Sequence, residues 1–330
     1  MRIVLCYPIE KRHYEQICAS APGHEVIDAG QERIAAELLD ADIFCGHAKV
    51  PVSWAEAVRR GRLQWIQSSA AGLDHCLTPE TRASPIVVTS ASGLFAEAVA
   101  EQTLALLLGI LRSLPVFFRA QERREFVRRP TRDLHHTTVG IVGLGGNGIR
   151  IAEVLRPFRT RLIATDMFAD EQPSCVDALW PADQLDRLLA ESDIVVLAAP
   201  LNAQTHGMIG AAQLARMKPG AILINVARGP IVVERDLVAS LQSGKLGGAG
   251  LDVTEVEPLP VDSPLWDLPH VIITPHVGAQ SLRRADNTTN LICDNLRRYF
   301  SGQPLLNLVD KQLGYPSPAA RRGEVPTPAQ

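Results

Sequence analysis

The sequence predicts an α/β protein with two domains, each built on a parallel sheet. Strand-like and helix-like segments alternate through both halves of the chain, a pattern typical of parallel sheets covered by helices. Near the middle, residues 139–148 run from an apolar strand through a glycine-rich turn into a helix. The length of 330 residues also suits two domains of typical size.

The composition excludes several classes of protein. Hydrophobic residues make up 46% of the chain and charged residues 21%, which is near the globular average and allows a sizeable core. The net charge is −3, so we expect no nucleic-acid partner, and the Arg-rich segment 119–129 is interleaved with glutamates, as on a solvated helix face. The longest apolar run, 103–111, is about half the length that crosses a bilayer, and no signal peptide is visible. We therefore expect no membrane association.

The six cysteines are scattered along the chain, with no C-x-x-C pair and no clustering with histidine. This spacing argues against a disulfide framework and against a zinc site, so we expect no metal. Unpaired cysteines are typical of a reducing compartment, and we predict a cytoplasmic protein.

The first third of the chain carries strand patterns at 3–7, 42–45, 63–66 and 86–89, with helical segments between the first three. It has no glycine fingerprint, so we do not expect it to bind a nucleotide. The loop 67–74 is rich in small residues and follows a strand, which suits either an anion cradle of backbone N–H groups or a plain connection. The apolar helix expected at 96–114 is either a core helix or part of an interface between domains or subunits.

The glycine-rich turn has the G-x-G-x-x-G spacing of a dinucleotide-binding unit, formed by Gly143, Gly145 and Gly148. The first glycine permits the tight turn, the second lets a pyrophosphate approach the backbone, and the third lets helix and strand pack closely. The next strand ends on Asp166, 18 residues beyond Gly148 and near the spacing of about 20 expected for the acid that binds a ribose 2′-hydroxyl. This carboxylate repels a 2′-phosphate, so we predict NAD as the cofactor.

From residue 138 the chain shows a second alternating run, with enough strands for a complete Rossmann-type doubly wound sheet. The strands are expected at 138–143, 161–165, 193–198, 221–226, 249–252 and 271–274. A last helix is expected at 281–300. The tail that follows is rich in proline and poor in apolar residues, which predicts disorder.

Side chains suited to catalysis lie at or just after the ends of the strands expected at 221–226, 249–252 and 271–274. The carboxyl ends of the strands are where a parallel sheet binds ligands. Arg228 suits a substrate carboxylate, and His276 has the intrinsic chemistry to exchange a proton with a hydroxyl or carbonyl oxygen. A nearby carboxylate would stabilise the imidazolium and orient the ring. Taken alone, Arg228 also fits a surface or cap position, Glu257 a solvated loop and His276 a structural histidine, and no ligand spacing supports a metal.

Five ordered segments together resemble the D-isomer-specific 2-hydroxyacid dehydrogenase family, NAD(P)-dependent enzymes that include glyoxylate/hydroxypyruvate reductases and 3-phosphoglycerate dehydrogenases. The segments are 139–148, 225–230, 250–259, 264–268 and 274–278. The resemblance implies that Arg228 binds substrate, that His276 is the acid/base group, and that Glu257, immediately before Pro258, is its partner rather than Glu255. It also implies that Asp252 holds the nicotinamide carboxamide.

The resemblance further implies that backbone N–H groups of the loop Ala70, Ala71 and Gly72 bind the substrate carboxylate together with Arg228. The Gly146-Asn147 pair departs from the basic residue and isoleucine that many members carry within the glycine loop. The residues expected to bind the cofactor are Gly143, Gly145, Gly146, Asn147, Gly148, Asp166, Ala227, Asp252 and Gly278.

The family architecture implies a flavodoxin-like substrate domain into which the NAD-binding domain is inserted. We expect the substrate domain at 1–105 and 285–310, the NAD-binding domain at 106–284, and a disordered tail at 311–330. Family members are usually homodimers joined through the long helix and the arm after it. We therefore expect a homodimeric, NAD-dependent D-2-hydroxyacid dehydrogenase or 2-keto acid reductase acting on a small substrate of the glyoxylate, hydroxypyruvate or phosphoglycerate type. The alternative is a non-catalytic, NAD(H)-sensing protein like the family's corepressors.

Overall fold

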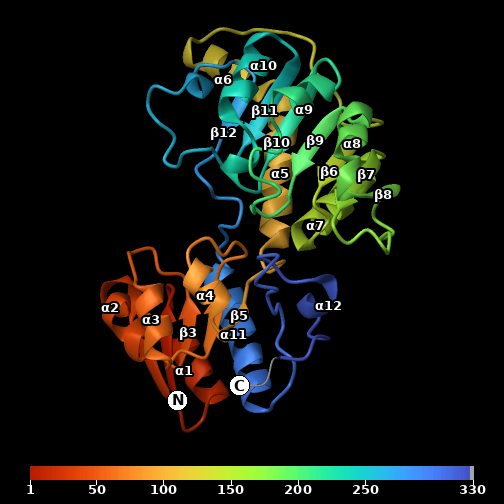
Figure 1. The fold of residues 1–330 in the computed structure, drawn as a ribbon. Helices are drawn as coiled ribbons and strands as arrows, with labels where there is room; N and C mark the ends of the chain where they lie inside the picture. The colour runs from red at the N-terminus through yellow and green to blue at the C-terminus, as the bar shows by residue number, and fades with distance from the viewer. Residues whose placement is uncertain (328–330) are drawn as a thin grey trace. The chain divides into compact units, whose positions relative to one another are not determined.

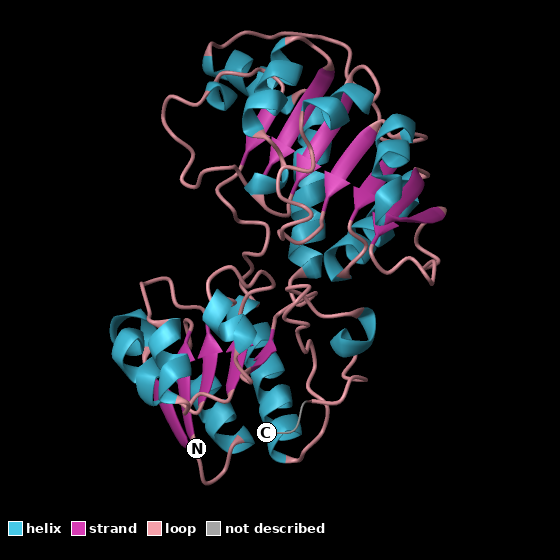
Figure 2. Ribbon diagram, in the orientation of Figure 1, coloured by secondary structure: helices cyan, strands magenta, loops and turns pink. Residues whose placement is uncertain are grey.

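The computed structural model describes residues 1–327, which form two compact units (Figures 1 and 2). One unit comprises residues 1–94 together with the segment that starts at Ser281, and the other comprises Phe95–Gln280. The second unit is therefore an insertion in the first. It begins at 95, where 106 was expected, because α5 (Ala96–Leu111) packs on α7 (Gly146–Leu155) and β11 (Leu246–Leu251), and it ends at 280, where 284 was expected.

The first unit contains a five-stranded parallel sheet in the order β2-β1-β3-β4-β5, the flavodoxin-like arrangement. Its strands are β1 (Arg2–Cys6), β2 (Glu25–Asp28), β3 (Ile43–Gly46), β4 (Trp65–Ser68) and β5 (Val87–Thr89). Two apolar cores lie on opposite faces of this sheet. The helices are α1 (Lys11–Ser20), α2 (Gly30–Glu37), α3 (Trp54–Arg60), α4 (Pro79–Ala83), α11 (Arg284–Phe300) and α12 (Pro318–Arg321).

The second unit contains a seven-stranded parallel sheet in the order β12-β11-β10-β9-β6-β7-β8. Strand order reverses at β6, the topological switch point at which such sheets bind ligands. Its other strands are β6 (Thr138–Val142), β7 (Arg161–Asp166), β8 (Ala178–Pro181), β9 (Ile194–Leu197), β10 (Ala221–Asn225) and β12 (Val271–Ile273). Its remaining helices are α6 (Leu114–Glu122), α8 (Leu185–Glu191), α9 (Ala211–Arg216) and α10 (Glu234–Gln242).

The central strands of this sheet are continuous apolar runs because helices cover both of their faces. Every residue of β9 and β10 is buried. One face packs against α5 and α7, and the other packs against α8, α9 and α10 (Figure 2). The two parallel sheets confirm the predicted fold class.

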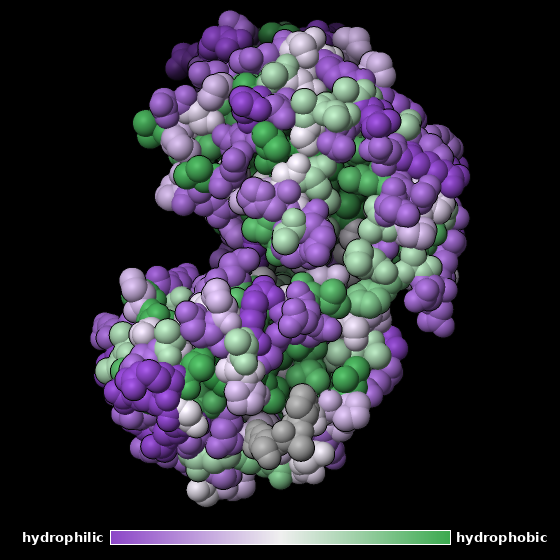
Figure 3. All heavy atoms as spheres, viewed as in Figure 1, coloured by the Kyte–Doolittle hydropathy of each residue, from purple (hydrophilic) through white to green (hydrophobic). Residues whose placement is uncertain are grey.

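Polar residues dominate the visible surface of both units, with apolar residues scattered among them (Figure 3). In the part of the chain that the structure describes, no single helix has the length and apolar character to cross a membrane. Only α5 and α6 taken together pass on length and composition, with a bend of 69° between them. Eight residues of α5 are buried within the protein.

The tail differs from the predicted disorder over residues 311–327. Lys311 Nζ donates to backbone carbonyls near the end of α4, those of Thr81, Ser84 and Ile86. Further on, Ala320 of α12 is 4% exposed and belongs to the same core as β1 and α11. These contacts join the tail to distant parts of the chain, so its local composition carries no sign of them. Residues 328–330 lie outside the described residues.

All six cysteines are free thiols, and five of them are buried. Burial raises the pKa of Cys6 to about 11, and it also raises the pKa of Cys45, Cys76, Cys175 and Cys293 above the ordinary thiol value. Cys18 is partly exposed. Because the thiolate is the reactive form, we expect an aromatic disulfide reagent at pH 8 to label Cys18 first in the native protein.

Mass spectrometry of the labelled peptides checks the order in which the thiols are labelled. Cys18→Ser is the control, and it should remove the labelling that occurs first. The other five thiols should react only when the chain unfolds. Fast labelling of Cys45 or Cys76 in the folded protein would contradict the expectation.

Candidate active site

Three neighbouring strands of the second unit end at the candidate site. β10, β11 and β12 are adjacent and parallel, so their carboxyl ends lie along one edge of the sheet (Figure 1). Arg228 follows β10, Asp252 follows β11, and His276 follows β12. These three residues therefore lie at one edge of the sheet, as expected from the parallel order of the strands.

His276 and Glu257 form a hydrogen-bonded pair. The distance from His276 Nδ1 to Glu257 Oε2 is 2.8 Å, and Glu257 Oε1 accepts a hydrogen bond from Thr254 N at 3.3 Å. An ionised carboxylate can only accept, so beside one Nδ1 is the donor and Nε2 is the ring nitrogen left to exchange a proton. The histidine side chain is 43% exposed, which leaves it accessible to a ligand.

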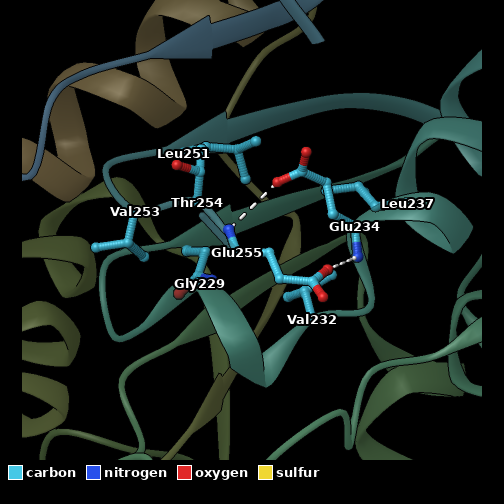
Figure 4. Close-up of a pocket in the computed structure, with 9 residues that line it drawn as sticks. Gly229, Val232, Glu234, Leu237, Leu251, Val253, Thr254 and Glu255 are labelled. Atoms are coloured by element: carbon cyan, nitrogen blue, oxygen red, sulfur yellow. Dashed lines mark hydrogen bonds between the residues drawn. The ribbon is translucent and has the colours of Figure 1, made fainter. Parts of the chain in front are cut away.

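The two nearby glutamates have different partners. Glu257 contacts His276, whereas Glu255 Oε2 accepts a hydrogen bond from Glu234 N at 2.9 Å. Figure 4 shows Glu255 turned towards Glu234, at a small pocket that Gly229 and Thr254 also line. Of the two glutamates, Glu257 is thus the one bonded to His276, and its catalytic role stays a prediction.

Asp252 is 2% exposed, and its carboxylate binds the loop that carries His276. Oδ1 accepts from Thr274 Oγ1 at 2.6 Å and from Val277 N at 3.0 Å, and Oδ2 accepts from Gly278 N at 2.7 Å. The backbone oxygen of Asp252 also accepts from His276 N at 2.7 Å. The expected role of Asp252 towards a nicotinamide stays a prediction, but its role in shaping the histidine loop is visible in these bonds.

Sequence reasoning missed two residues of this network. Gln102 Nε2, on α5, donates to Thr274 Oγ1 at 2.8 Å, and Thr274 passes a hydrogen bond on to Asp252. Gln102 and Thr274 are 172 positions apart. Thr274 begins the 274–278 segment but Gln102 lies in no motif, so only the fold could reveal the contact between them.

Arg228 lies on a loop shaped by the buried Asn225. Asn225 Oδ1 accepts from Ala227 N at 3.1 Å, and its Nδ2 donates to the Arg228 carbonyl at 3.0 Å. Next in the chain, a Cβ on Gly229 would lie 1.8 Å from the Thr254 carbonyl oxygen. Only glycine allows the two backbones to pack this closely, so the arginine loop and the Glu257 loop are fixed against each other.

The glycine loop fits a dinucleotide. Gly143 has a φ of +92°, and its Cβ would lie 2.7 Å from Ala199 N. A Cβ on Gly148 would lie 2.1 Å from the Gly143 carbonyl oxygen. In the described part of the chain, the N–H groups of Gly146 and Asn147 in the first turn of α7 have no acceptor, as a phosphate-binding helix start requires. These features shape a phosphate-binding turn, and a side chain at Gly143 or Gly148 would clash with backbone atoms.

Asp166 ends β7, the strand next to β6, and its carboxylate is fixed by backbone donors. Oδ2 accepts from Leu144 N at 2.6 Å and Oδ1 accepts from Phe168 N at 2.8 Å. Leu144 lies within the glycine loop, so the carboxylate is held directly beside it. This is the position expected for the acid that binds a ribose.

The expected substrate loop lies in the first unit, after β4. Ala70 N donates to Ser68 Oγ at 3.0 Å, so that N–H group is already bonded. Within residues 1–327, the N–H groups of Ala71 and Gly72 have no acceptor. The loop therefore presents two available donors, and its part in substrate binding stays a prediction.

The chain is similar to known proteins over most of its length. Residues 104–278 match the family model described as D-isomer specific 2-hydroxyacid dehydrogenase, NAD binding domain. The chain is 34% identical over 258 residues to glyoxylate/hydroxypyruvate reductase B of Citrobacter koseri, covering 76% of this chain and 79% of that protein. It is 32% identical to an uncharacterised protein of Corynebacterium melassecola over 88% of this chain and 95% of that protein.

Solved structures similar to this one carry the same family and activity names as the family model and the Citrobacter koseri protein. A D-isomer-specific 2-hydroxyacid dehydrogenase from Xanthobacter autotrophicus, in complex with NADPH, has a TM-score of 0.81 at 31% identity and covers 95% of this chain and 99% of its own. An NADPH-dependent glyoxylate/hydroxypyruvate reductase from Sinorhizobium meliloti has a TM-score of 0.80 at 29% identity, with the same coverage. With the sequence matches, these confirm the resemblance: the chain belongs to the D-isomer-specific 2-hydroxyacid dehydrogenase family of oxidoreductases, and it carries that family's pyridine-nucleotide-binding domain.

Proposed function

We propose that this protein is an NAD-linked reductase of a small 2-keto acid, which also runs in reverse as a D-2-hydroxyacid dehydrogenase. The observation that carries the proposal is the 2.8 Å pair between His276 Nδ1 and Glu257 Oε2, set on the sheet edge that also carries Arg228. The relative in Citrobacter koseri is named as a glyoxylate/hydroxypyruvate reductase. Glyoxylate and hydroxypyruvate are therefore the first substrates to test.

Each of the three side chains has one task in this reaction. The planar guanidinium of Arg228 binds the substrate carboxylate and polarises the neighbouring ketone. His276 gives the proton on Nε2 to the carbonyl oxygen during reduction, and takes it back during oxidation. Glu257 orients the ring through Nδ1 and stabilises its charged form. The nicotinamide of a bound dinucleotide supplies the hydride.

We expect the unmodified protein to reduce glyoxylate, hydroxypyruvate or another short 2-keto acid with NADH. His276→Ala should lower kcat by roughly 100- to 10,000-fold, the usual range for losing a general acid. Arg228→Ala should instead raise KM for the keto acid most strongly, because it removes a charged contact to the carboxylate. Steady-state assays that follow NADH absorbance measure both effects.

The matched control is Arg235→Ala, which removes a guanidinium that is 88% exposed on α10 and should leave both constants unchanged. Near-normal rates in the His276 and Arg228 variants would refute the proposed roles. Tight NADH binding without turnover on any keto acid would instead favour the non-catalytic, NAD(H)-sensing alternative.

The second part of the proposal is a preference for NADH over NADPH, although the Xanthobacter and Sinorhizobium proteins are described with NADPH. The Asp166 carboxylate, fixed by Leu144 N and Phe168 N, would repel a 2′-phosphate. We expect a higher kcat/KM with NADH than with NADPH. Asp166→Asn should reduce the difference between these two kcat/KM values, because it removes the negative charge and keeps the shape of the side chain. Equal kcat/KM values for the two cofactors in the unmodified protein would contradict this.

The third part of the proposal is a homodimer that covers the exposed apolar residues after α5. Phe118 on α6 is 57% exposed, and Phe126 and Val127 beyond it are 91% and 45% exposed. We expect light scattering to give twice the chain mass of 35.9 kDa. Replacing Phe118 and Phe126 by Ser should lower the measured mass to that of one chain. A monomeric unmodified protein would contradict the proposed homodimer.

A further inference from the structure

The helix α10 begins without a capping side chain of its own. Val233 occupies its N-cap position, and its side chain has no oxygen to accept a hydrogen bond from the first turn. The missing acceptor comes from a distant loop, because Glu255 Oε2 accepts from Glu234 N at 2.9 Å. In return, Glu255 N donates to Glu234 Oε2 at 3.2 Å (Figure 4). Two reciprocal bonds therefore join α10 to the loop after β11.

This loop is the one that presents Glu257. Thr254, next to Glu255, donates its N–H to Glu257 Oε1 at 3.3 Å and its hydroxyl to the Val256 carbonyl at 2.8 Å. The Thr254 carbonyl packs on Gly229 with no room for a side chain. Residues 254–257 thus form a short turn with one end bound to α10 and the other bound to His276.

The carboxylates of Glu234 and Glu255 each bind the backbone of the other residue, although like charges repel each other. Each one is compensated by a backbone N–H donor, and Glu255 also lies at the positive end of the α10 dipole. A Ser or Asp at position 233 would cap the helix without joining it to anything else. Capping by Glu255 joins the helix to the turn.

We propose that Glu255 is a positioning residue for the Glu257–His276 pair, with Glu234 as its partner. This inference rests on the proposed function and adds two residues to it that do not touch the substrate. It also accounts for two glutamates only two positions apart: Glu255 holds the turn, and Glu257 contacts the histidine.

A matched control lies on the same helix. Asp236 Oδ2 accepts from Ala211 N at 2.9 Å, in the first turn of α9, where Gly210 at the N-cap has no side-chain acceptor. Asp236 is thus also a carboxylate that caps a neighbouring helix, and its bond leads away from the 254–257 turn. Asp236→Ala removes a cap of the same kind and leaves the turn intact.

The experiment compares Glu255→Ala, Glu255→Gln, Glu234→Ala and Asp236→Ala in the full-length protein. Glu255→Ala and Asp236→Ala should each lower Tm by roughly 2–4 °C, the usual effect of one lost cap in domains of this size. Unlike Asp236→Ala, Glu255→Ala should also lower kcat, by roughly tenfold to a hundredfold, because a small misplacement of Glu257 disturbs the acid/base pair. KM for NADH should be unchanged.

Glu255→Gln should restore most of kcat, because its amide oxygen can still accept from Glu234 N. Glu234→Ala breaks the other half of the link while leaving the Glu255 carboxylate in place, so it keeps the inference testable if Glu255→Ala fails to fold. The inference is overturned if kcat falls no further in Glu255→Ala or Glu234→Ala than in Asp236→Ala. An inactive unmodified protein would be a failure of the proposed function instead.

Discussion

A buried carboxylate organises the candidate site. Asp252 is 2% exposed, and an unpaired charge at such a depth would be strongly destabilising. Three donors to its side chain remove that penalty, and two of them are the backbone N–H groups of Val277 and Gly278. His276 is held between these bonds and the Asp252 carbonyl, in a left-handed conformation with a φ of +53°. That conformation is unfavourable for a non-glycine residue, and it persists because the surrounding bonds over-determine it.

Much of the fold could be predicted from local patterns. The strand, the glycine turn and the acid after the next strand predicted a Rossmann-type sheet, and the seven-stranded sheet has β6 and β7 in those places. The same reasoning placed Arg228, Asp252 and His276 at one edge, because parallel neighbours end together. The choice of Glu257 over Glu255 needed the family resemblance. Both glutamates follow the same strand within a few residues, and only the bond to His276 distinguishes them.

The remainder depended on contacts between distant parts of the chain. Gln102 reaches the histidine loop from α5, and Glu255 caps a helix 21 positions before it, and the motifs of the sequence indicate neither contact. The order of the tail depends in the same way on Lys311 and Ala320, whose partners lie far off in the sequence. The apolar pattern of α5 correctly showed burial but carried no information about which unit buries it. Local composition therefore predicted the type of each segment well, but it did not predict which distant residues the segment contacts.

The insertion of one unit into the other also sets an order of assembly. The core on one face of the first sheet combines Ile3 and Leu5 of β1 with Ile292 and Leu296 of α11. A chain emerging from the ribosome exposes that face of β1 until residues near 300 have been made, whereas Phe95–Gln280 is by then complete. Since domains fold as units during synthesis, the later-encoded nucleotide-binding unit can finish folding first. The apolar face of the N-terminal strands that α11 covers stays exposed until that helix has been made, and exposed apolar surface of this kind is what chaperones bind during synthesis.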